Sequence, residues 1–135
     1  MAGCRRTRTE LVVPENGLVL DRMLSAYNRG DVDGVVADAT DDVEYVLGSR
    51  GVRLVGRGAW RSVVLSVATA MPGRRLNVWR RLAGSDAIAI EWVVEGVSSG
   101  QVEGYPAAGE RVRLEGCSVI SFRNDRIVAF RDYVD

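Results

Sequence analysis

The spacing of apolar residues changes at Pro72-Gly73, and this change constrains the fold of the 135-residue chain more than any other feature. Before this point, apolar side chains recur every three to four residues, which is typical of amphipathic helices. After it, apolar and polar side chains alternate, which is typical of strands with one buried face. Helices followed by a run of strands predict an α+β domain, with the helices on one face of an antiparallel sheet.

Three helices are expected in the first half of the chain. The first begins at Pro14, because proline suits a first helical turn, and it ends at Arg29-Gly30. The second is short, is capped by Asp31, and has its last apolar position at Ala39. The third follows Gly56-Arg57-Gly58 and ends at the proline-glycine pair. Strands are expected over residues 43–47, 76–82, 87–97, 111–122 and 127–134.

The length and the lack of a linker predict one domain over residues 14–135, preceded by a flexible arm over residues 1–13. Basic and acidic residues balance at 18 each, so nucleic acid is not an expected partner. No apolar run is long enough to span a membrane, and the N-terminus does not resemble a secretory signal. Cys4 and Cys117 are far apart, which favours reduced thiols and a cytoplasmic location.

The chain contains no histidine and no lysine, and this limits its chemistry. Ser-His-Asp and Cys-His catalytic groups and imine-forming lysines are excluded. Two distant cysteines without histidine exclude the usual zinc ligand sets, and no glycine-rich phosphate loop is present. We therefore expect neither a metal nor a cofactor. Any reaction would depend on carboxylates, tyrosines, arginines, hydroxyls or bound water.

Asp132 is the strongest candidate for such chemistry. Strand alternation places it between Phe130 and Val134 on the apolar face of the last strand, where a charged residue breaks the pattern. A free aspartate has a pKa near ~3.9, and burial would raise that pKa because an apolar environment disfavours the charged form. Such an acid could transfer protons near neutral pH. Alternatively, Asp132 could be hydrogen-bonded within the protein and take no part in chemistry.

The same alternation gives Asp132 a set of inward-facing neighbours. Tyr45 on the first strand could donate a hydrogen bond to a substrate oxygen, or it could belong to the core. The substrate-binding candidates are Leu47, Trp92, Val94, Leu114, Ser118 and Phe130. On the opposite face, two glutamates of the long strand are expected near two arginines of the next strand: Glu91, Glu95, Arg111 and Arg113. This pattern predicts a solvated face or a polar oligomer interface.

Several short motifs occur in an order and spacing that resemble a known superfamily. Three of them are Tyr27-Asn28-Arg29-Gly30-Asp31, Asp41-Asp42-Val43 and Gly56-Arg57-Gly58. They resemble the nuclear transport factor 2-like superfamily. Three narrower ones, which resemble the SnoaL-like polyketide cyclases, are Ile90-Glu91-Trp92-Val93-Val94-Glu95-Gly96, Gly104-Tyr105-Pro106-Ala107-Ala108-Gly109-Glu110-Arg111-Val112 and Asn124-Asp125-Arg126-Ile127. The final Phe130-Arg131-Asp132-Tyr133-Val134-Asp135 resembles the last strand of limonene epoxide hydrolases.

The resemblance covers about residues 15–135 and implies a cone-shaped fold. In such a fold, three N-terminal helices pack on a curved, mostly antiparallel sheet that encloses a hydrophobic pocket, often in a homodimer. In both subfamilies an aspartate on the last strand is a general acid or base, and Asp132 matches it. A first-strand tyrosine of the epoxide hydrolases helps to position water, and Tyr45 matches that residue.

The chain also departs from each subfamily. Trp92 and Val94 stand where the epoxide hydrolases carry an arginine and a second aspartate, and Leu47 stands for a first-strand asparagine. Ser98 occupies the position of a histidine in the SnoaL-like cyclases. Ketosteroid isomerases of the same fold have a helix-one tyrosine and a first-strand aspartate where this chain has Met23 and Leu47.

These observations favour a cofactor-independent cyclase or isomerase that acts on a small, hydrophobic, polyketide-like substrate. Asp132 would be the acid or base, and Tyr45 and Trp92 would orient substrate oxygens. An epoxide hydrolase is the first alternative, but it needs a second carboxylate in the pocket, and the strands supply only one that faces inward. A non-catalytic ligand-binding or dimerisation module is the second alternative. We expect a homodimer without nucleic-acid or membrane partners.

Overall fold

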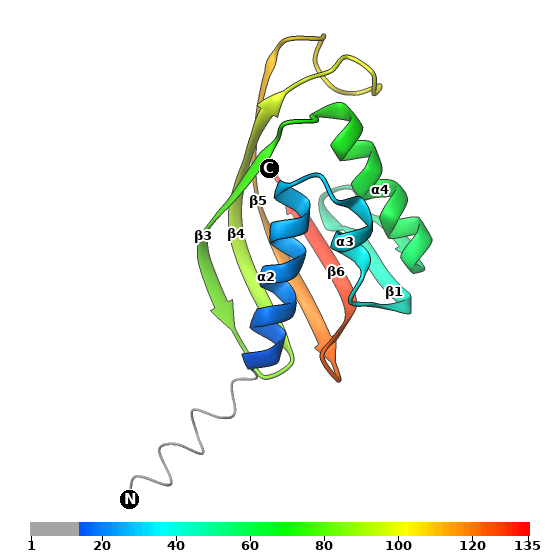
Figure 1. Cartoon of the computed structure of the whole chain (residues 1–135), viewed down its shortest axis with the longest axis vertical. Helices are drawn as coiled ribbons and strands as arrows, with labels where there is room; N and C mark the ends of the chain where they lie inside the picture. The colour runs from blue at the N-terminus through cyan, green and yellow to red at the C-terminus, as the bar shows by residue number, and fades with distance from the viewer. Residues whose placement is uncertain (1–13) are drawn as a thin grey trace, which may run out of the picture.

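The structure, a computed structural model, describes residues 14–135 (Figure 1). The predicted N-terminal arm and Cys4 lie outside these residues. The helical elements are α2 (Pro14–Asn28), α3 (Val32–Val36), the 3₁₀ turn η1 (Gly48–Arg50) and α4 (Arg57–Ala70). The strands are β1 (Ala39–Leu47), β2 (Val52–Val55), β3 (Arg75–Ala83), β4 (Ala87–Val97), β5 (Arg111–Arg123) and β6 (Arg126–Val134). This order confirms the predicted α+β class.

The strands form a six-stranded sheet in the order β2-β1-β6-β5-β4-β3. Neighbouring strands are antiparallel except β1 and β6, which run parallel, so the sheet is mixed. All three helices lie on one face of the curved sheet, with α2 against β3 and β4 and α4 against β1 (Figure 1). This layering confirms the expected cone-like architecture and leaves a space between helices and sheet for a core and a cavity.

The two N-terminal helices follow the predicted pattern. Gly30 comes after α2 in a left-handed conformation with a φ of 77°, which glycine adopts without strain. Asp31 then caps α3, because its carboxylate accepts a hydrogen bond from the Gly34 backbone N–H at 2.9 Å. Both helices bury apolar side chains, including Leu20 and Val35, against the sheet. No helix within residues 14–135 is long and apolar enough to cross a membrane.

One boundary and one strand differ from the sequence-based predictions. The expected extension of the second helix to Ala39 is wrong, because α3 ends at Val36 and Ala39 begins β1. Ala39 is fully buried and pairs with Ile127 of β6, so contact between distant segments decides this boundary. β2 is a short and mostly exposed edge strand that the residue pattern does not predict. The other predicted helices and strands are confirmed.

The hairpin between β5 and β6 sets the register on which the site depends. Asn124 and Asp125 have φ values of 53° and 63°, as a two-residue turn that matches strand twist requires. The resulting pairing places Ser118 of β5 directly opposite Asp132 of β6. A shift of one residue would turn Asp132 to the outer face of the sheet, since side chains alternate along a strand.

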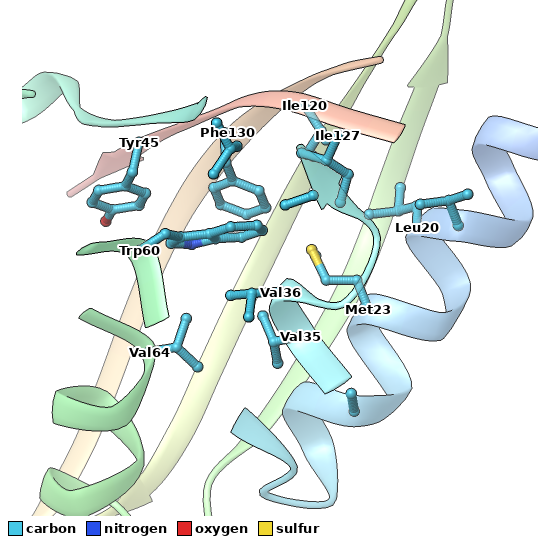
Figure 2. Packing of buried hydrophobic residues seen from close by; sticks show 14 of the residues in the cluster. Leu20, Met23, Val35, Val36, Tyr45, Trp60, Val64, Ile120, Ile127 and Phe130 are labelled. Atoms are coloured by element: carbon cyan, nitrogen blue, oxygen red, sulfur yellow. The ribbon is translucent and has the colours of Figure 1, made fainter. Parts of the chain in front are cut away.

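The hydrophobic core fills the space between the helices and the inner face of the sheet (Figure 2). Trp60 of α4 is its largest fully buried side chain and packs on Phe130 of β6, with the ring centroids 5.1 Å apart. Tyr45 of β1 also stacks on Phe130, with the ring centroids 6.3 Å apart. These aromatic contacts anchor β1 and β6, which carry the two predicted catalytic residues.

The outer face of the sheet carries the expected charges with one change of partner. Glu95 of β4 lies opposite Arg113 of β5, and their charged groups are 3.9 Å apart, as predicted. Glu91 instead forms an ion pair with Arg80 of β3 at 3.5 Å. β4 has two neighbouring strands, β5 and β3, so its outward side chains can pair with either of them.

Candidate active site

A cavity of about 1230 Å³ lies between the helices and the inner face of the sheet. This exceeds the roughly 300–1,000 Å³ of common ligand pockets, so a multi-ring organic molecule would fit. Most of the lining side chains are apolar. The eight site residues predicted from the sequence all border this cavity: Tyr45, Leu47, Trp92, Val94, Leu114, Ser118, Phe130 and Asp132.

Asp132 is the centre of a hydrogen-bonded group on the cavity wall. The Ser118 hydroxyl donates a hydrogen bond to Asp132 Oδ1 at 2.5 Å, and the Tyr45 hydroxyl donates one to Oδ2 at 2.9 Å. The Trp92 indole N–H donates to Ser118 Oγ at 2.8 Å. Three residues, from β1, β4 and β5, therefore hold the carboxyl group of β6 in one orientation.

The chemistry of these donors assigns different roles to the two carboxyl oxygens. An indole N–H can only donate, so Ser118 Oγ must accept at that contact and direct its single proton to Asp132. Oδ1 of Asp132 is thereby kept as an acceptor. Tyr45 is both donor and acceptor, so it can bond Oδ2 with or without a proton there. A proton gained or lost by Asp132 is therefore carried on Oδ2, beside the Tyr45 hydroxyl.

Burial raises the pKa of Asp132 above the ordinary aspartate value. The hydrogen bonds from Ser118 and Tyr45 oppose this rise, because they favour the carboxylate. Burial and the nearby Asp132 charge also raise the pKa of Tyr45, which keeps its hydroxyl protonated. Asp132 stays partly accessible through the cavity it borders, so a ligand can reach a carboxyl group that protein atoms otherwise surround.

Gly116 allows the Trp92 ring to reach this group. A Cβ at Gly116 would lie 2.6 Å from the indole ring and 2.7 Å from the Tyr133 carbonyl oxygen, both too close for any side chain. Gly116 pairs directly with Trp92 across β4 and β5. The ring can therefore lie across β5 with its N–H at Ser118.

Two tyrosines border the cavity that the sequence analysis does not assign to the site. Tyr27 is near the end of α2, and Tyr105 is in the loop between β4 and β5. Burial raises the pKa of both hydroxyls. Tyr27 could have been recognised, because it follows the apolar stripe of α2 that faces the sheet. Tyr105 lies in an irregular loop, where periodicity carries no information about direction.

Ser98, which stands at a histidine position of the SnoaL-like cyclases, has a role in the same loop. It is buried, and its hydroxyl donates to the Pro106 carbonyl oxygen at 2.6 Å and accepts from the Gly100 N–H at 3.1 Å. It is not among the residues that border the cavity. Ser98 therefore shapes the loop that carries Tyr105.

Asp132 is the only acid in the interior of this cavity among residues 14–135. Glu103 and Asp135 also border the cavity, but both are exposed to solvent. Within the same residues, no cluster of three or more acidic or cysteine side chains is placed to hold a metal ion. The arrangement offers one proton-transfer group on the wall of a large apolar chamber.

Comparison with known proteins places this geometry in a wider context. The family model of the SnoaL-like domain matches residues 20–130. No curated protein matches the sequence. A putative polyketide cyclase from Xanthomonas campestris pv. campestris is 25% identical, with a TM-score of 0.74 over 90% of this chain and 91% of that one.

Two further solved structures share the fold at lower identity. A putative SnoaL-like polyketide cyclase from Jannaschia sp. CCS1 is 14% identical, with a TM-score of 0.80 over 90% of this chain and 86% of that one. An LEH-like epoxide hydrolase from M. tuberculosis is 22% identical, with a TM-score of 0.72 over 90% of this chain and 84% of that one. The fold therefore occurs in proteins named for different activities, and the site residues must distinguish between these activities.

Proposed function

The chain belongs to the SnoaL-like domain family, and from this premise we propose that it is a cofactor-independent cyclase or isomerase acting on a hydrophobic, polyketide-like substrate. One observation carries the proposal: a single carboxyl group with a raised pKa is held by hydrogen bonds on the wall of a large apolar cavity. Such a group can move a proton between carbon and oxygen atoms of a bound molecule. The expected homodimer and cytoplasmic location stay predictions.

The reaction begins with Asp132 as a carboxylate. It removes a proton from a carbon next to a substrate carbonyl, and the electron pair of the broken C–H bond forms an enolate. In an isomerase, the proton returns from Asp132 to another carbon of the conjugated system. In a cyclase, the enolate carbon attacks a second carbonyl carbon, and the new alkoxide takes the proton from Asp132. Either route regenerates the carboxylate and consumes no other reactant.

The neighbouring residues prepare this step without a cofactor. We assign Tyr45 and Ser118 to positioning of Asp132, because both direct their hydroxyl protons to its carboxylate. Trp92 acts through Ser118, since its indole N–H is already engaged there. The apolar candidates that border the cavity would bind the substrate body and exclude water: Leu47, Val94, Leu114 and Phe130.

The number of acids supports this proposal over the epoxide hydrolase alternative. Opening an epoxide with water usually needs one group to activate the water and another to protonate the epoxide oxygen. Asp132 is the only interior acid of this cavity within residues 14–135. A proton shift or ring closure can use one carboxyl group twice, first as base and then as acid.

The experiment measures the first step alone and needs no knowledge of the natural substrate. Purified protein is incubated in D₂O with 2-tetralone, a bicyclic ketone, and deuterium incorporation next to the carbonyl is followed by NMR. We expect exchange above background in the wild type and a loss of about 10²- to 10⁴-fold in Asp132→Asn. Asp125→Asn is the matched control, because Asp125 is exposed in the β5–β6 turn, where asparagine tolerates a positive φ.

Equal exchange by wild type and Asp132→Asn would refute the acid–base role. Styrene oxide is tested in parallel, with the diol product measured by chromatography. Diol formation that depends on Asp132, without ketone exchange, would favour the epoxide hydrolase. Binding of both compounds without conversion of either would favour a ligand-binding module.

A further inference from the structure

Arg74 is a second charged group in the interior, and the proposed reaction does not use it. It lies between α4 and β3 and is only 2% exposed. Its backbone packs beneath Gly96 of β4, where an added Cβ would lie 3.3 Å from Arg74 Cα. The backbone of Arg74 is therefore packed closely against β4, and its side chain is buried.

The charge of Arg74 has no acidic partner within residues 14–135. None of the ion pairs among these residues includes it, and its Nε and Nη2 atoms are buried without a hydrogen-bond partner. Its close contact is the Tyr27 ring, with the guanidinium carbon 4.0 Å from the ring centroid. Burying an uncompensated charge destabilises a fold, so an apolar side chain would suit this position better.

Arg74 does not border the cavity itself, but it lies against the ring of Tyr27, which does. Tyr27 and Tyr105 border the cavity, and the Arg74 charge acts on both hydroxyls, opposing the rise of their pKa values that burial causes. The Asp132 charge acts on Tyr27 as well and on Tyr45, whose hydroxyl it binds. Tyr27 therefore experiences both charges, and we call the part of the cavity wall formed by Tyr27 and Tyr105 beside Arg74 its positive end.

The two tyrosines on the Arg74 side have hydroxyl protons to offer a ligand. Among residues 14–135, Tyr45 is the only tyrosine whose hydroxyl donates a hydrogen bond to a protein group. Tyr27 and Tyr105 can therefore donate to an atom inside the cavity. Two hydroxyl donors backed by a buried positive charge are suited to an anionic oxygen group.

We propose that Tyr27, Tyr105 and Arg74 form an anion-binding subsite that takes a carboxylate at one end of an apolar ligand. The proposal deepens the proposed function and rests on it only in assigning the reacting carbon to the Asp132 end. The substrate class is then an apolar carboxylic acid rather than a neutral compound. The carboxylate lies at the positive end, away from Asp132, so repulsion between the two acids helps to fix the direction of binding.

A matched pair of ligands tests the subsite independently of turnover. Binding of 2-naphthoate and of neutral 2-acetylnaphthalene, which share one apolar body, is measured by calorimetry at about 0.15 M salt, where long-range surface attraction is screened. We expect the wild type to bind the carboxylate about 10- to 100-fold more tightly than the ketone. Arg74→Met should remove most of this preference, whereas Arg75→Met should keep it, because Arg75 is the exposed next residue.

Equal affinity of the wild type for the two ligands would overturn the proposal, and so would an unchanged preference in Arg74→Met. If Arg74→Met does not fold, the double variant Tyr27→Phe/Tyr105→Phe replaces it and should also lower the preference. Asp132→Asn separates this proposal from the proposed function: it should lose ketone exchange but still prefer the carboxylate. If Asp132→Asn lost the preference for the carboxylate and Arg74→Met kept it, the selectivity would depend on Asp132 and not on Arg74. That result would overturn the proposal.

Discussion

The two interior charges of this protein have opposite surroundings. Asp132 on β6 is bonded by Ser118 and Tyr45, and Trp92 supports it through Ser118. Arg74, before β3, has an aromatic ring beside it and two nitrogen atoms without hydrogen-bond partners. Other side chains of the protein bind both carboxyl oxygens of Asp132, whereas two nitrogen atoms of Arg74 have no hydrogen-bond partner. We therefore assign the proposed reaction to Asp132 and the proposed binding of an anion to the Arg74 side.

The largest expected effect separates reaction from binding. Asp132→Asn keeps the size of the side chain but cannot accept a proton, so ketone exchange should fall by about 10²- to 10⁴-fold. Binding of 2-naphthoate should persist, because the anion subsite lies at the other end of the cavity. The measurement is NMR exchange combined with calorimetry on the same preparation. If Asp132→Asn lost both ketone exchange and binding of 2-naphthoate, the reacting group and the anion subsite would not be separate parts of the cavity.

The second prediction tests the bonded group around Asp132. Ser118→Ala leaves the Trp92 N–H and Asp132 Oδ1 without their partner, which should lower the free energy of unfolding by about 1–3 kcal/mol. Urea denaturation followed by tryptophan fluorescence measures this change. Ser121→Ala is the control, because Ser121 belongs to the same strand but to the opposite face. Similar losses in the two variants would show that the hydrogen-bonded group has no special stability.

The third prediction is an increase in stability. Arg74→Met removes an uncompensated buried charge and retains a long apolar side chain, so the free energy of unfolding should rise by about 1 kcal/mol or more. Arg75→Met should change it little, since Arg75 is exposed. The same denaturation assay applies. A marked loss of stability in Arg74→Met alone would mean that Arg74 holds the fold together.

The fourth prediction concerns the pH dependence of stability. Because burial raises the pKa of Asp132, the folded protein holds this proton more tightly than the unfolded chain does. The stabilisation of the fold that results from this tighter proton binding is fully present below the ordinary aspartate pKa of 3.8. It is lost as the pH rises through the raised pKa. The stability of Asp132→Asn relative to wild type should therefore increase with pH over this window and then level off. Denaturation midpoints from pH 3.5 to 8 measure it, and a difference that falls with pH would show a lowered pKa.

The smallest effect is expected on the outer face. Glu95 and Arg113 face each other there, but their side chains are 60% and 57% exposed, so solvent screens their attraction. Glu95→Gln should change the free energy of unfolding by less than about 0.5 kcal/mol. Thermal denaturation at low and high salt would reveal any larger contribution. An effect as large as that of Ser118→Ala would show that this face is not simply solvated.

Particular residues show where prediction from the sequence succeeds and where it ends. The helices, the long strands and the inward direction of Asp132 follow from local spacing, since each depends on residues close together in the chain. The helical spacing at Ala39 misleads, because pairing with Ile127 outweighs it. Tyr105 and the β2 edge strand are missed, because neither lies in a strongly periodic segment.

The spacing of residues along the chain predicts the α+β class, the order of the long elements, and the single carboxyl group that faces the apolar side of the last strand. It does not predict which groups meet that carboxyl, because the register of β4, β5 and β6 brings Trp92, Ser118 and Asp132 together. The tertiary structure also decides that Arg74 is buried while Arg75 is exposed. The physical reason is that periodicity reports the direction of a side chain, whereas the partners of a buried charge are set by contacts between distant segments.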